Sequence, residues 1–271
     1  VQTCALPISV AGWADAHARY GSLPFSELLE PAIHFARDGF PVSTRLALDF
    51  AAQGRALNEA GKALYLPTGS PPPVGSLLRN PPLANSLETI ARGGADAFYR
   101  GTIGNTLAEF VAAEGGHLRA EDFVTHTSTW VEPLRGSYLD HTFVVMPPNT
   151  QGPAQLALME MSKHHPLAEL GHNSSPYLHT LIELKKLAFA DRDRWIADPE
   201  MADVPVDRLL DPAYLAERAA LVDGVRAAVD VQPGFGGDPS GDRDMDDSGD
   251  TVYLTAVDQW GNAVSWIQSN F

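Results

Sequence analysis

The C-terminal stretch of the sequence places the strongest constraint on the fold. Two runs of alternating apolar residues, 253–258 and 263–269, are rich in β-branched and aromatic side chains, which is typical of strands. The residues between them predict a hairpin turn in which Gly261 or Asn262 takes a positive φ. Because an isolated hairpin is marginally stable, we expect it to pack on further sheet, and we interpret the sequence as a fragment open at both ends.

Thr251 lies where an acidic, glycine-rich segment meets the first of these strands. A threonine hydroxyl is a weak nucleophile that needs a base beside it. Cleavage of the chain between Asp250 and Thr251 would create an α-amine that could act as this base. An α-amine has a pKa of about 8, so a useful fraction of it is neutral at physiological pH. On local pattern alone, an ordinary strand-opening threonine is the simpler interpretation.

The residues around Thr251 resemble the start of the small subunit in the γ-glutamyltransferase (γ-glutamyltranspeptidase) family. The members of this family are N-terminal nucleophile hydrolases. The shared pattern is a threonine, an apolar strand ending in Asp258, and the run Gly-Asn-Ala-Val-Ser at residues 261–265. The resemblance implies an α+β fold of four αββα layers, here incomplete, with a helix-rich large-subunit portion. It also implies that the precursor cleaves itself before Thr251, which then attacks the γ-amide of glutathione or a related donor.

Further matches in the same order extend the resemblance from about residue 11 to residue 271, and they include the runs 20–24, 36–40, 130–136 and 186–195. They imply three parts. Residues 9–250 are the C-terminal part of the large subunit, in which 230–250 form an acidic processing linker. Residues 251–271 begin the small subunit. Residues 1–8 equal the in-frame translation of a short-read sequencing adapter, so we expect them to be non-native.

The resemblance also implies roles for single residues. In the family, a threonine or serine eighteen residues after the nucleophile bonds to it, and Ser269 occupies that position. Two residues later, many transpeptidases have an asparagine that holds the donor, whereas this sequence has Phe271. Side chains alternate along a strand, so Asn270 cannot replace it. The family's remaining site residues, namely the oxyanion glycines and the groups that bind the two ends of the donor, are expected outside this sequence. The 271-residue chain alone is therefore expected to be inactive.

Because Phe271 stands where many transpeptidases have asparagine, the sequence leaves two alternatives to a γ-glutamyl donor. The first alternative is an acylase of the same fold that cleaves a side-chain amide from a β-lactam or a similar substrate. The second alternative is an unprocessed, non-catalytic binding homologue. A full-length protein that never splits before Thr251 and has no amidase activity would support the second.

Composition limits the partners. The formal net charge of −15 argues against nucleic acid and anionic membranes as partners. The sequence contains no apolar run of 18 or more residues. The expected partners are a small γ-glutamyl donor, water or an amine acceptor, and the chain's own small subunit after cleavage. The resemblance implies a periplasmic or secreted protein, and the single cysteine, Cys4, permits no internal disulfide.

No cofactor or metal is expected. The histidines do not occur in a His-Glu-x-x-His frame, so a zinc site is not predicted. The acidic run 242–246 has the aspartate spacing of a calcium loop. However, Asp247 stands where such a loop requires glycine, and Tyr253 stands where it requires a bidentate glutamate. This stretch is therefore interpreted as a solvated acidic linker.

Apolar periodicity and end signals predict the remaining elements. Six helices are predicted, over 24–37 with a kink or break at Pro31, over 43–60, over 83–91, over 103–113, over 153–163, and from a cap at 174–176 to about 195. An apolar strand is predicted at 142–146, and residues 119–123 are predicted to be a polar connection. The charged run 191–194 predicts an ion network that fixes the architecture rather than a catalytic group.

Overall fold

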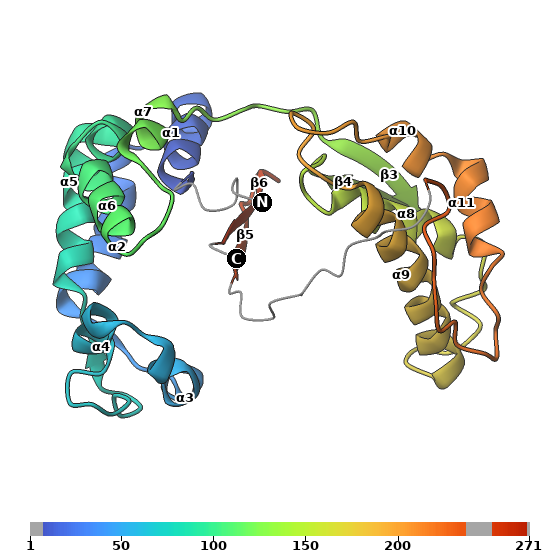
Figure 1. The fold of residues 1–271 in the computed structure, drawn as a ribbon, viewed down its shortest axis with the longest axis horizontal. Coiled ribbons are helices and arrows are strands. Elements are labelled where there is room, and N and C mark those ends of the chain that lie inside the picture. The colour runs from blue at the N-terminus through green and yellow to red at the C-terminus, as the bar shows by residue number, and fades with distance from the viewer. Residues whose placement is uncertain (1–7, 237–250, 270–271) are drawn as a thin grey trace. The chain divides into compact units, whose positions relative to one another are not determined.

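The computed structural model describes residues 8–236 and 251–269. They form two compact units, one that extends to Ser128 and includes the C-terminal hairpin, and one that begins at Thr129 (Figure 1). Helices dominate both units. The described residues also contain three two-stranded antiparallel sheets, which pair β1 with β2, β3 with β4, and β5 with β6. The predicted α+β class is therefore confirmed.

The first unit is built on helices α2 and α5, which pack along each other. Its elements are α1 (Ser9–Tyr20), α2 (Phe25–Asp38), β1 (Phe40–Pro41), α3 (Thr44–Gln53), the 3₁₀ turn η2 (Gly54–Ala56), α4 (Glu59–Tyr65), β2 (Leu77–Leu78), α5 (Pro81–Tyr99), α6 (Thr102–Ala113) and α7 (Ala120–Thr125). Apolar side chains of α1, α2, α5, α6 and α7 meet in one core, which includes Ile90 and Phe123. Burial of this apolar surface holds the unit together.

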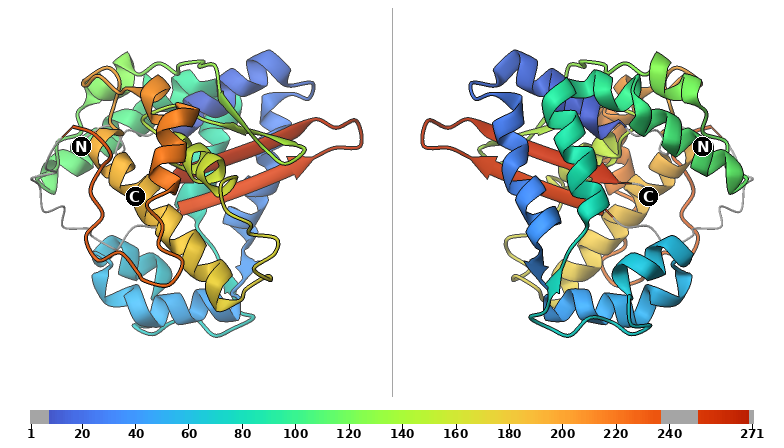
Figure 2. Two further views of the ribbon diagram at one scale, coloured as in Figure 1. Left: turned by 90° about the vertical axis from the view of Figure 1, so that its right-hand side faces the viewer. Right: turned by 90° about the vertical axis from the view of Figure 1, so that its left-hand side faces the viewer.

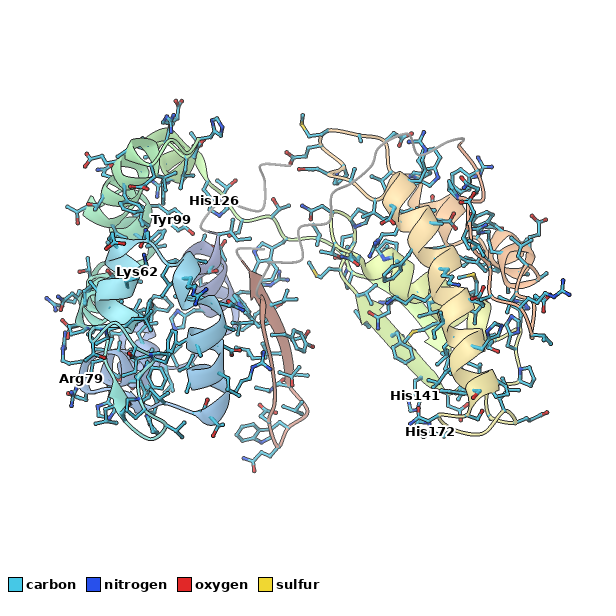
Figure 3. All side chains as sticks on the ribbon, turned by 60° about the horizontal axis from the view of Figure 1, so that its bottom comes forward. Lys62, Arg79, Tyr99, His126, His141 and His172 are labelled. Carbon is cyan, nitrogen blue, oxygen red and sulfur yellow. The ribbon has the colours of Figure 1, made fainter. Side chains whose placement is uncertain are left out.

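Tyr99 connects three segments of the first unit. Its hydroxyl accepts a hydrogen bond of 3.0 Å from the backbone N–H of Ala11, at the start of the chain. Its ring lies beside the ring of His126, with centroids 5.3 Å apart (Figure 3). Burial raises the pKa of Tyr99 and lowers the pKa of His126, because it disfavours the charged form of each. Both side chains are therefore neutral structural groups near neutral pH.

The second unit is built on α9, its longest helix. The unit contains β3 (Leu134–Tyr138), β4 (His141–Val145), α8 (Gly152–Ser162), α9 (Ser175–Trp195), α10 (Val206–Leu209) and α11 (Pro212–Ala219). Ser174 caps α9 by accepting a hydrogen bond from the N–H of Tyr177, and Pro176 lies in its first turn, as predicted. Buried residues of α8, α9 and α11, among them Met161 and Leu184, form its core.

Several predicted boundaries are wrong. The helix predicted over 43–60 ends at Gln53, where a 3₁₀ turn begins, and Asn58 caps a separate helix α4. Helix α2 continues through Pro31 instead of breaking there. A proline removes one hydrogen-bond donor, and here the packing of α2 along α5 outweighs that loss.

One further prediction agrees with the structure and one is wrong. The helix predicted over 83–91 is the first of two helical stretches within α5, which are joined across a kink at Gly94, where the backbone leaves the helical conformation (φ 65°). Residues 119–123 are not a simple connection, since helix α7 begins at Ala120. The carboxylate of Asp122 accepts a 2.7 Å hydrogen bond from the N–H of Arg119 and so caps this helix.

Candidate active site

The C-terminal hairpin consists of β5 (Thr251–Val257) and β6 (Ala263–Ser269), which lie side by side as an antiparallel ribbon (Figure 2). Their register pairs Thr251 with Ser269 at one end and Val257 with Ala263 at the turn. The two strands and the turn agree with the prediction. The hairpin thus brings the two proposed catalytic residues to directly opposite backbone positions.

The turn fixes this register. Asp258 accepts hydrogen bonds of 2.9 Å from the N–H groups of Trp260 and Asn262, and a third bond of 2.8 Å from the Asn262 side chain. Gly261 takes a φ of 85°, which favours glycine. The hydrogen bond from the Asn262 side chain, with those from the turn's N–H groups, lowers the pKa of Asp258 below its ordinary value. Because a one-residue slip would move every strand residue to the opposite face, this turn determines which residue faces Thr251.

The hairpin is rich in exposed apolar side chains. Tyr253, Leu254, Val264 and Ile267 are all more than a third exposed. Within the described parts of the two strands, the hydroxyls of Tyr253 and Ser265 form a hydrogen bond across the hairpin, 2.9 Å apart. That the hairpin packs on further sheet stays a prediction.

Three sequence-based predictions concern residues outside the described ranges. The first is Asp250, the residue before the expected cleavage point. The other two are Phe271, in the family's donor-binding position, and the acidic run 242–246. The side chains of Thr251 and Ser269 are likewise not described, although their backbone pairing is.

The loop between β4 and α8 is a structural connection. The Thr150 hydroxyl donates to the carbonyls of Met146 and Pro147, at 2.9 and 3.0 Å, and accepts a bond of 3.2 Å from the N–H of Gly152. The Gln151 side chain accepts a 3.0 Å hydrogen bond from Arg192. These polar groups are satisfied within the protein, which favours a simple connection over a ligand contact at this loop.

The charged run on α9 forms the predicted ion network, but its partners come from elsewhere. Asp191 is buried and pairs with buried Arg218 on α11, at 3.2 Å. Its carboxylate also accepts a 2.7 Å hydrogen bond from the Tyr214 hydroxyl. Burial, followed by this hydrogen bond, raises the pKa of Tyr214. Arg192 instead pairs with Asp193 at the surface, at 2.6 Å.

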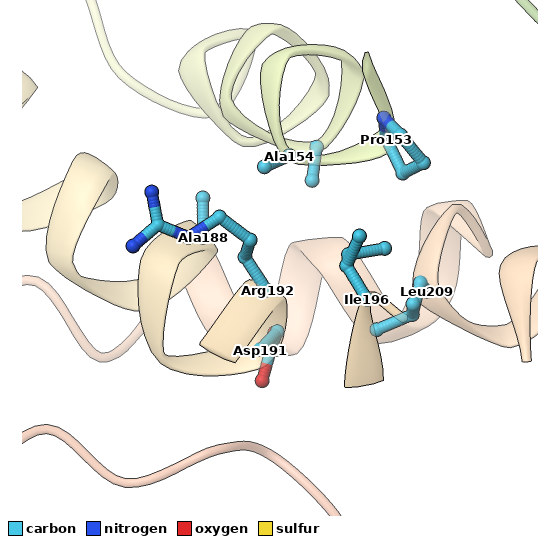
Figure 4. Close-up of a pocket in the computed structure, with 8 residues that line it drawn as sticks. Pro153, Ala154, Ala188, Asp191, Arg192, Ile196 and Leu209 are labelled. Atoms are coloured by element: carbon cyan, nitrogen blue, oxygen red, sulfur yellow. The ribbon is translucent and has the colours of Figure 1, made fainter. Parts of the chain in front are cut away.

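A small cavity lies beside this network, between α8 and α9 (Figure 4). Pro153 and Ala154 face Ala188 and Arg192 across it, whereas Asp191 points away from α8. Its volume is about 10 Å³, enough for about one water molecule. A substrate pocket is more than tenfold larger, so this cavity is not the site of the reaction.

Two histidines of the second unit hydrogen-bond backbone carbonyls. His179 donates from Nε2 to the carbonyl of Asp223, at 2.8 Å, and His165 contacts the carbonyl of Ala219, at 3.2 Å. Within the described ranges, no group of three or more histidine, cysteine, aspartate or glutamate residues could hold a metal ion.

None of the described helices has both the length and the apolar character needed to cross a bilayer.

Sequence reasoning missed Tyr214 and Arg218, the partners of Asp191. They lie on α11, which Asp211 caps and which begins at Pro212. This capping pair is the local signal that could have revealed the helix. The pairing of the two helices, however, depends on a fold that brings together residues 27 positions apart.

Comparison with known proteins places these features in a family. The family model described as Gamma-glutamyltranspeptidase matches residues 1–271. The chain is 35% identical over 268 residues to the Acylase ACY 1 proenzyme of Pseudomonas sp. (strain SE83), covering 98% of this chain and 46% of that protein. It is 31% identical over 265 residues to the Glutathione hydrolase proenzyme of Escherichia coli (strain K12), covering 96% and 44%. The chain spans about half the length of the curated relatives it matches.

Solved structures give the same result. The γ-glutamyltranspeptidase from Pseudomonas nitroreducens, complexed with L-DON, matches with a TM-score of 0.76 and 33% identity, covering 83% of this chain and 68% of that one. The cephalosporin acylase from Bacillus halodurans matches with a TM-score of 0.82 and 30% identity, covering 97% and 47%. The predicted family and the N-terminal nucleophile hydrolase fold are therefore confirmed.

Proposed function

Because this chain belongs to the gamma-glutamyltranspeptidase family, we propose that the full-length protein is a self-processing amidase that uses Thr251 as its nucleophile. The observation that carries the proposal is the register of the hairpin, which pairs Thr251 with Ser269 at the first position of β5. The proenzyme names of the relatives support a cleaved precursor.

Processing is the first stage of the proposed mechanism. The Thr251 hydroxyl attacks the carbonyl carbon of Asp250, and the bond from that carbon to the Thr251 nitrogen breaks. The nitrogen takes up a proton and becomes a free amine, while Asp250 is held as an ester on the Thr251 oxygen. Water then hydrolyses this ester. The products are an Asp250 carboxylate at the end of the large chain and a threonine with a free amine and a free hydroxyl.

Donor cleavage is the second stage. The neutral α-amine of Thr251 accepts the proton of its own hydroxyl while the oxygen attacks the amide carbonyl of the donor. The donor's amine leaves with a proton and its acyl group remains as an ester on Thr251. Water or an acceptor amine then attacks this ester and restores the threonine. No cofactor is needed for these steps.

The proposed role of Ser269 is to hydrogen-bond the nucleophile and hold it in position. Directly opposite residues of an antiparallel pair point to the same face and interact across it, and Thr251 and Ser269 are such a pair. The hydrogen bond would orient the Thr251 oxygen towards the donor.

We expect a Ser269→Ala variant of the full-length protein to lower kcat about 2- to 12-fold, the rate equivalent of one hydrogen bond worth about 0.5–1.5 kcal/mol. Single-turnover cleavage of a γ-glutamyl anilide measures this. Ser265→Ala is the matched control, because Ser265 lies on the same strand but pairs with Thr255. Equal rates for the two variants would contradict the proposed role.

The proposed donor is a γ-glutamyl amide of the glutathione type. The glutathione hydrolases among the relatives support it. One second candidate has support of its own, namely an acylase acting on a β-lactam side chain. The Acylase ACY 1 proenzymes are 35% identical to this chain, and Phe271 stands where many transpeptidases have asparagine.

A competition assay on the full-length enzyme distinguishes the two donors. A γ-glutamyl anilide and a β-lactam side-chain amide are mixed at equal concentration, and the ratio of their kcat/KM values is measured. Preference for the anilide supports the first candidate, and preference for the β-lactam amide supports the second.

The proposed assembly is a heterodimer of the two processed chains. Gel filtration under native conditions would reveal it as one particle that contains both chains.

A further inference from the structure

The two faces of the C-terminal hairpin carry different residues. Side chains alternate along each strand, so the register assigns positions 251 and 269 to one face and the positions next to them to the other. This second face contains the pairs Val252 with Gln268, Leu254 with Trp266, and Ala256 with Val264. Because Gln268 is its one polar position, we call it the apolar face.

Trp266 is the covered residue of the apolar face. Among the strand residues whose side chains are described, 252–257 and 263–267, Trp266 alone is half-buried and the others are exposed. Its neighbours Leu254 and Val264 are each 49% exposed. A tryptophan can bury about 150–250 Å² of surface, so the residue that covers Trp266 matters for how the hairpin is held.

Gly12 of α1 covers the outer edge of this indole. A Cβ atom at Gly12 would lie 3.4 Å from both Cζ2 and Cη2 of Trp266. Carbon atoms at this separation are in van der Waals contact, so the space accepts a methyl group and nothing larger. Both residues belong to the first unit. We call the surface of α1 at Gly12 the seat of the indole.

The contact explains why glycine occupies this position. Glycine weakens a helix relative to alanine, and Gly12 lies inside α1 without a positive φ. The backbone therefore does not need the conformational freedom of glycine there. The close approach of the indole is the physical reason for a residue without a side chain.

Helix α1 is held from its other side. At about 100° per residue, Gly12 lies nearly opposite Val10, which is 5% exposed in the core of the unit. Trp13 packs against the same core. The N–H of Ala11 donates to the Tyr99 hydroxyl, at 3.0 Å. The seat therefore lies on a helix whose opposite side is buried and hydrogen-bonded.

We propose that Gly12 and Trp266 are positioning residues that fix the nucleophile hairpin on α1, an inference whose catalytic consequence rests on the proposed function. Trp266 lies three residues from Ser269, about 10 Å along β6. The paired strands extend this anchor to Thr251, because the register fixes Thr251 opposite Ser269. Contact through the apolar face also turns the face of Thr251 away from α1.

Chain cleavage makes this contact an interface between two chains. Gly12 lies before the expected cleavage point and Trp266 lies after it, so the contact would join the large chain to the small chain. Once the peptide bond before Thr251 is broken, noncovalent contacts alone hold the hairpin on the large chain. A displacement of about 1 Å at a reacting group can lower the rate about 100-fold.

Gly12→Leu in the full-length protein tests the seat. Its side chain extends beyond Cβ into the space of the indole and should displace the hairpin. We expect kcat per processed molecule to fall about 10- to 100-fold, with a smaller change in KM, because the contact orients the nucleophile and does not touch the donor. Gly12→Ala is the matched control. The seat accepts its methyl group, so kcat should stay within about twofold of the wild type.

A compensating substitution identifies the contact. Trp266→Ala removes the indole and leaves room beside Gly12, so adding Gly12→Leu to this variant should cause little further loss. The double variant should be about tenfold more active than the product of the two single effects predicts. A Gly12→Leu effect of equal size in both backgrounds would overturn the proposal, because the leucine would then act without touching Trp266.

An NMR measurement tests the contact without any activity. The Thr251→Ala precursor is labelled with 5-fluorotryptophan, and adding Trp266→Phe assigns the fluorine signal of Trp266. Gly12→Ala should shift this signal, whereas Ala18→Ser, at an exposed position of the same helix, should leave it in place. An unmoved Trp266 signal in Gly12→Ala would show that the two residues do not touch and would overturn the proposal.

The outcomes separate this inference from the proposed function. A wild-type protein that neither splits nor cleaves an amide overturns the proposed function and the catalytic role of the contact, while the fluorine signal still decides whether the contact exists. A wild type that splits, with Gly12→Leu as active as Gly12→Ala, overturns the positioning role alone. If Gly12→Leu does not fold, Trp266→Ala decides. A kcat at least about tenfold below the wild type supports the role, and an unchanged kcat overturns it.

Discussion

A Thr251→Ala variant of the full-length protein is expected to remain one polypeptide and to lose amide cleavage. Alanine has no hydroxyl, so neither the attack on Asp250 nor the attack on the donor can occur. Removal of the nucleophile from a hydrolase that works through an acyl-enzyme costs about 10⁶ in kcat, and we expect a loss of at least about 10⁴ here. Gel electrophoresis of the purified protein and turnover of a γ-glutamyl anilide measure the two effects.

Two further variants sharpen this test. Thr251→Ser keeps a hydroxyl at the same position, and it should still split and retain activity at a reduced rate. Thr255→Ala removes a threonine from the same strand, four residues along, where it pairs with Ser265. It should split and turn over as the wild type does. Two chains from Thr251→Ala, or normal turnover, would contradict the mechanism.

An Asp191→Asn variant is expected to lower the free energy of unfolding by about 3–5 kcal/mol, the cost of removing one partner of a buried ion pair. Asparagine has nearly the shape of aspartate but no charge. It would leave Arg218, which is 5% exposed, without its counter-ion. The Asp191 carboxylate now accepts hydrogen bonds from the Tyr214 hydroxyl and the Gly234 N–H. The amide N–H₂ group of asparagine is itself a donor, so it could not accept these bonds.

Asp193→Asn is the matched control for this variant. Asp193 lies on the same helix and pairs with Arg192, but its side chain is 48% exposed. Exposed pairs contribute about 0–1 kcal/mol, so a small change is expected. Urea denaturation of the full-length variants compares the two. Equal shifts of the two midpoints would show that the Asp191 cluster does not hold the second unit together.

The elements predicted correctly are those with local signals. Ser174 and Pro176 mark the start of α9, and Asp258 with Gly261 marks the hairpin turn. Both signals act within a few residues, so the sequence alone reveals them. The relation between Thr251 and Ser269 was expected only from the family resemblance, and the register of the structure places the two residues opposite each other.

The elements predicted wrongly are those in which tertiary contacts outweigh local preference. A kink or a break was expected at Pro31, and helix α2 continues past this residue where it packs along α5. The helix predicted over 83–91 does stop at a kink at Gly94, but a second helical stretch that was not predicted follows it to Tyr99. Glycine and proline lower helix stability by an amount that burial of an apolar face can offset.

The environment of Asp191 was predictable only in part. Its charge and the charges beside it indicated an ion network, but its partner Arg218 lies 27 residues away. The contacts of residues 234–236 with α9 were not foreseen, because these residues belong to the stretch 230–250, which was interpreted as an acidic linker. Their attachment depends on Asp191 and Trp195, whose positions are set by the packing of α9.

The central claim is that cleavage makes Thr251 the first residue of a new chain. Intact mass measurement of the purified full-length protein, combined with N-terminal sequencing of its smaller chain, tests this most directly. The account predicts two chains whose summed mass exceeds that of the precursor by one water molecule, with the smaller chain beginning at Thr251. A single uncut chain in an active preparation, or a smaller chain that begins at any other residue, would contradict it.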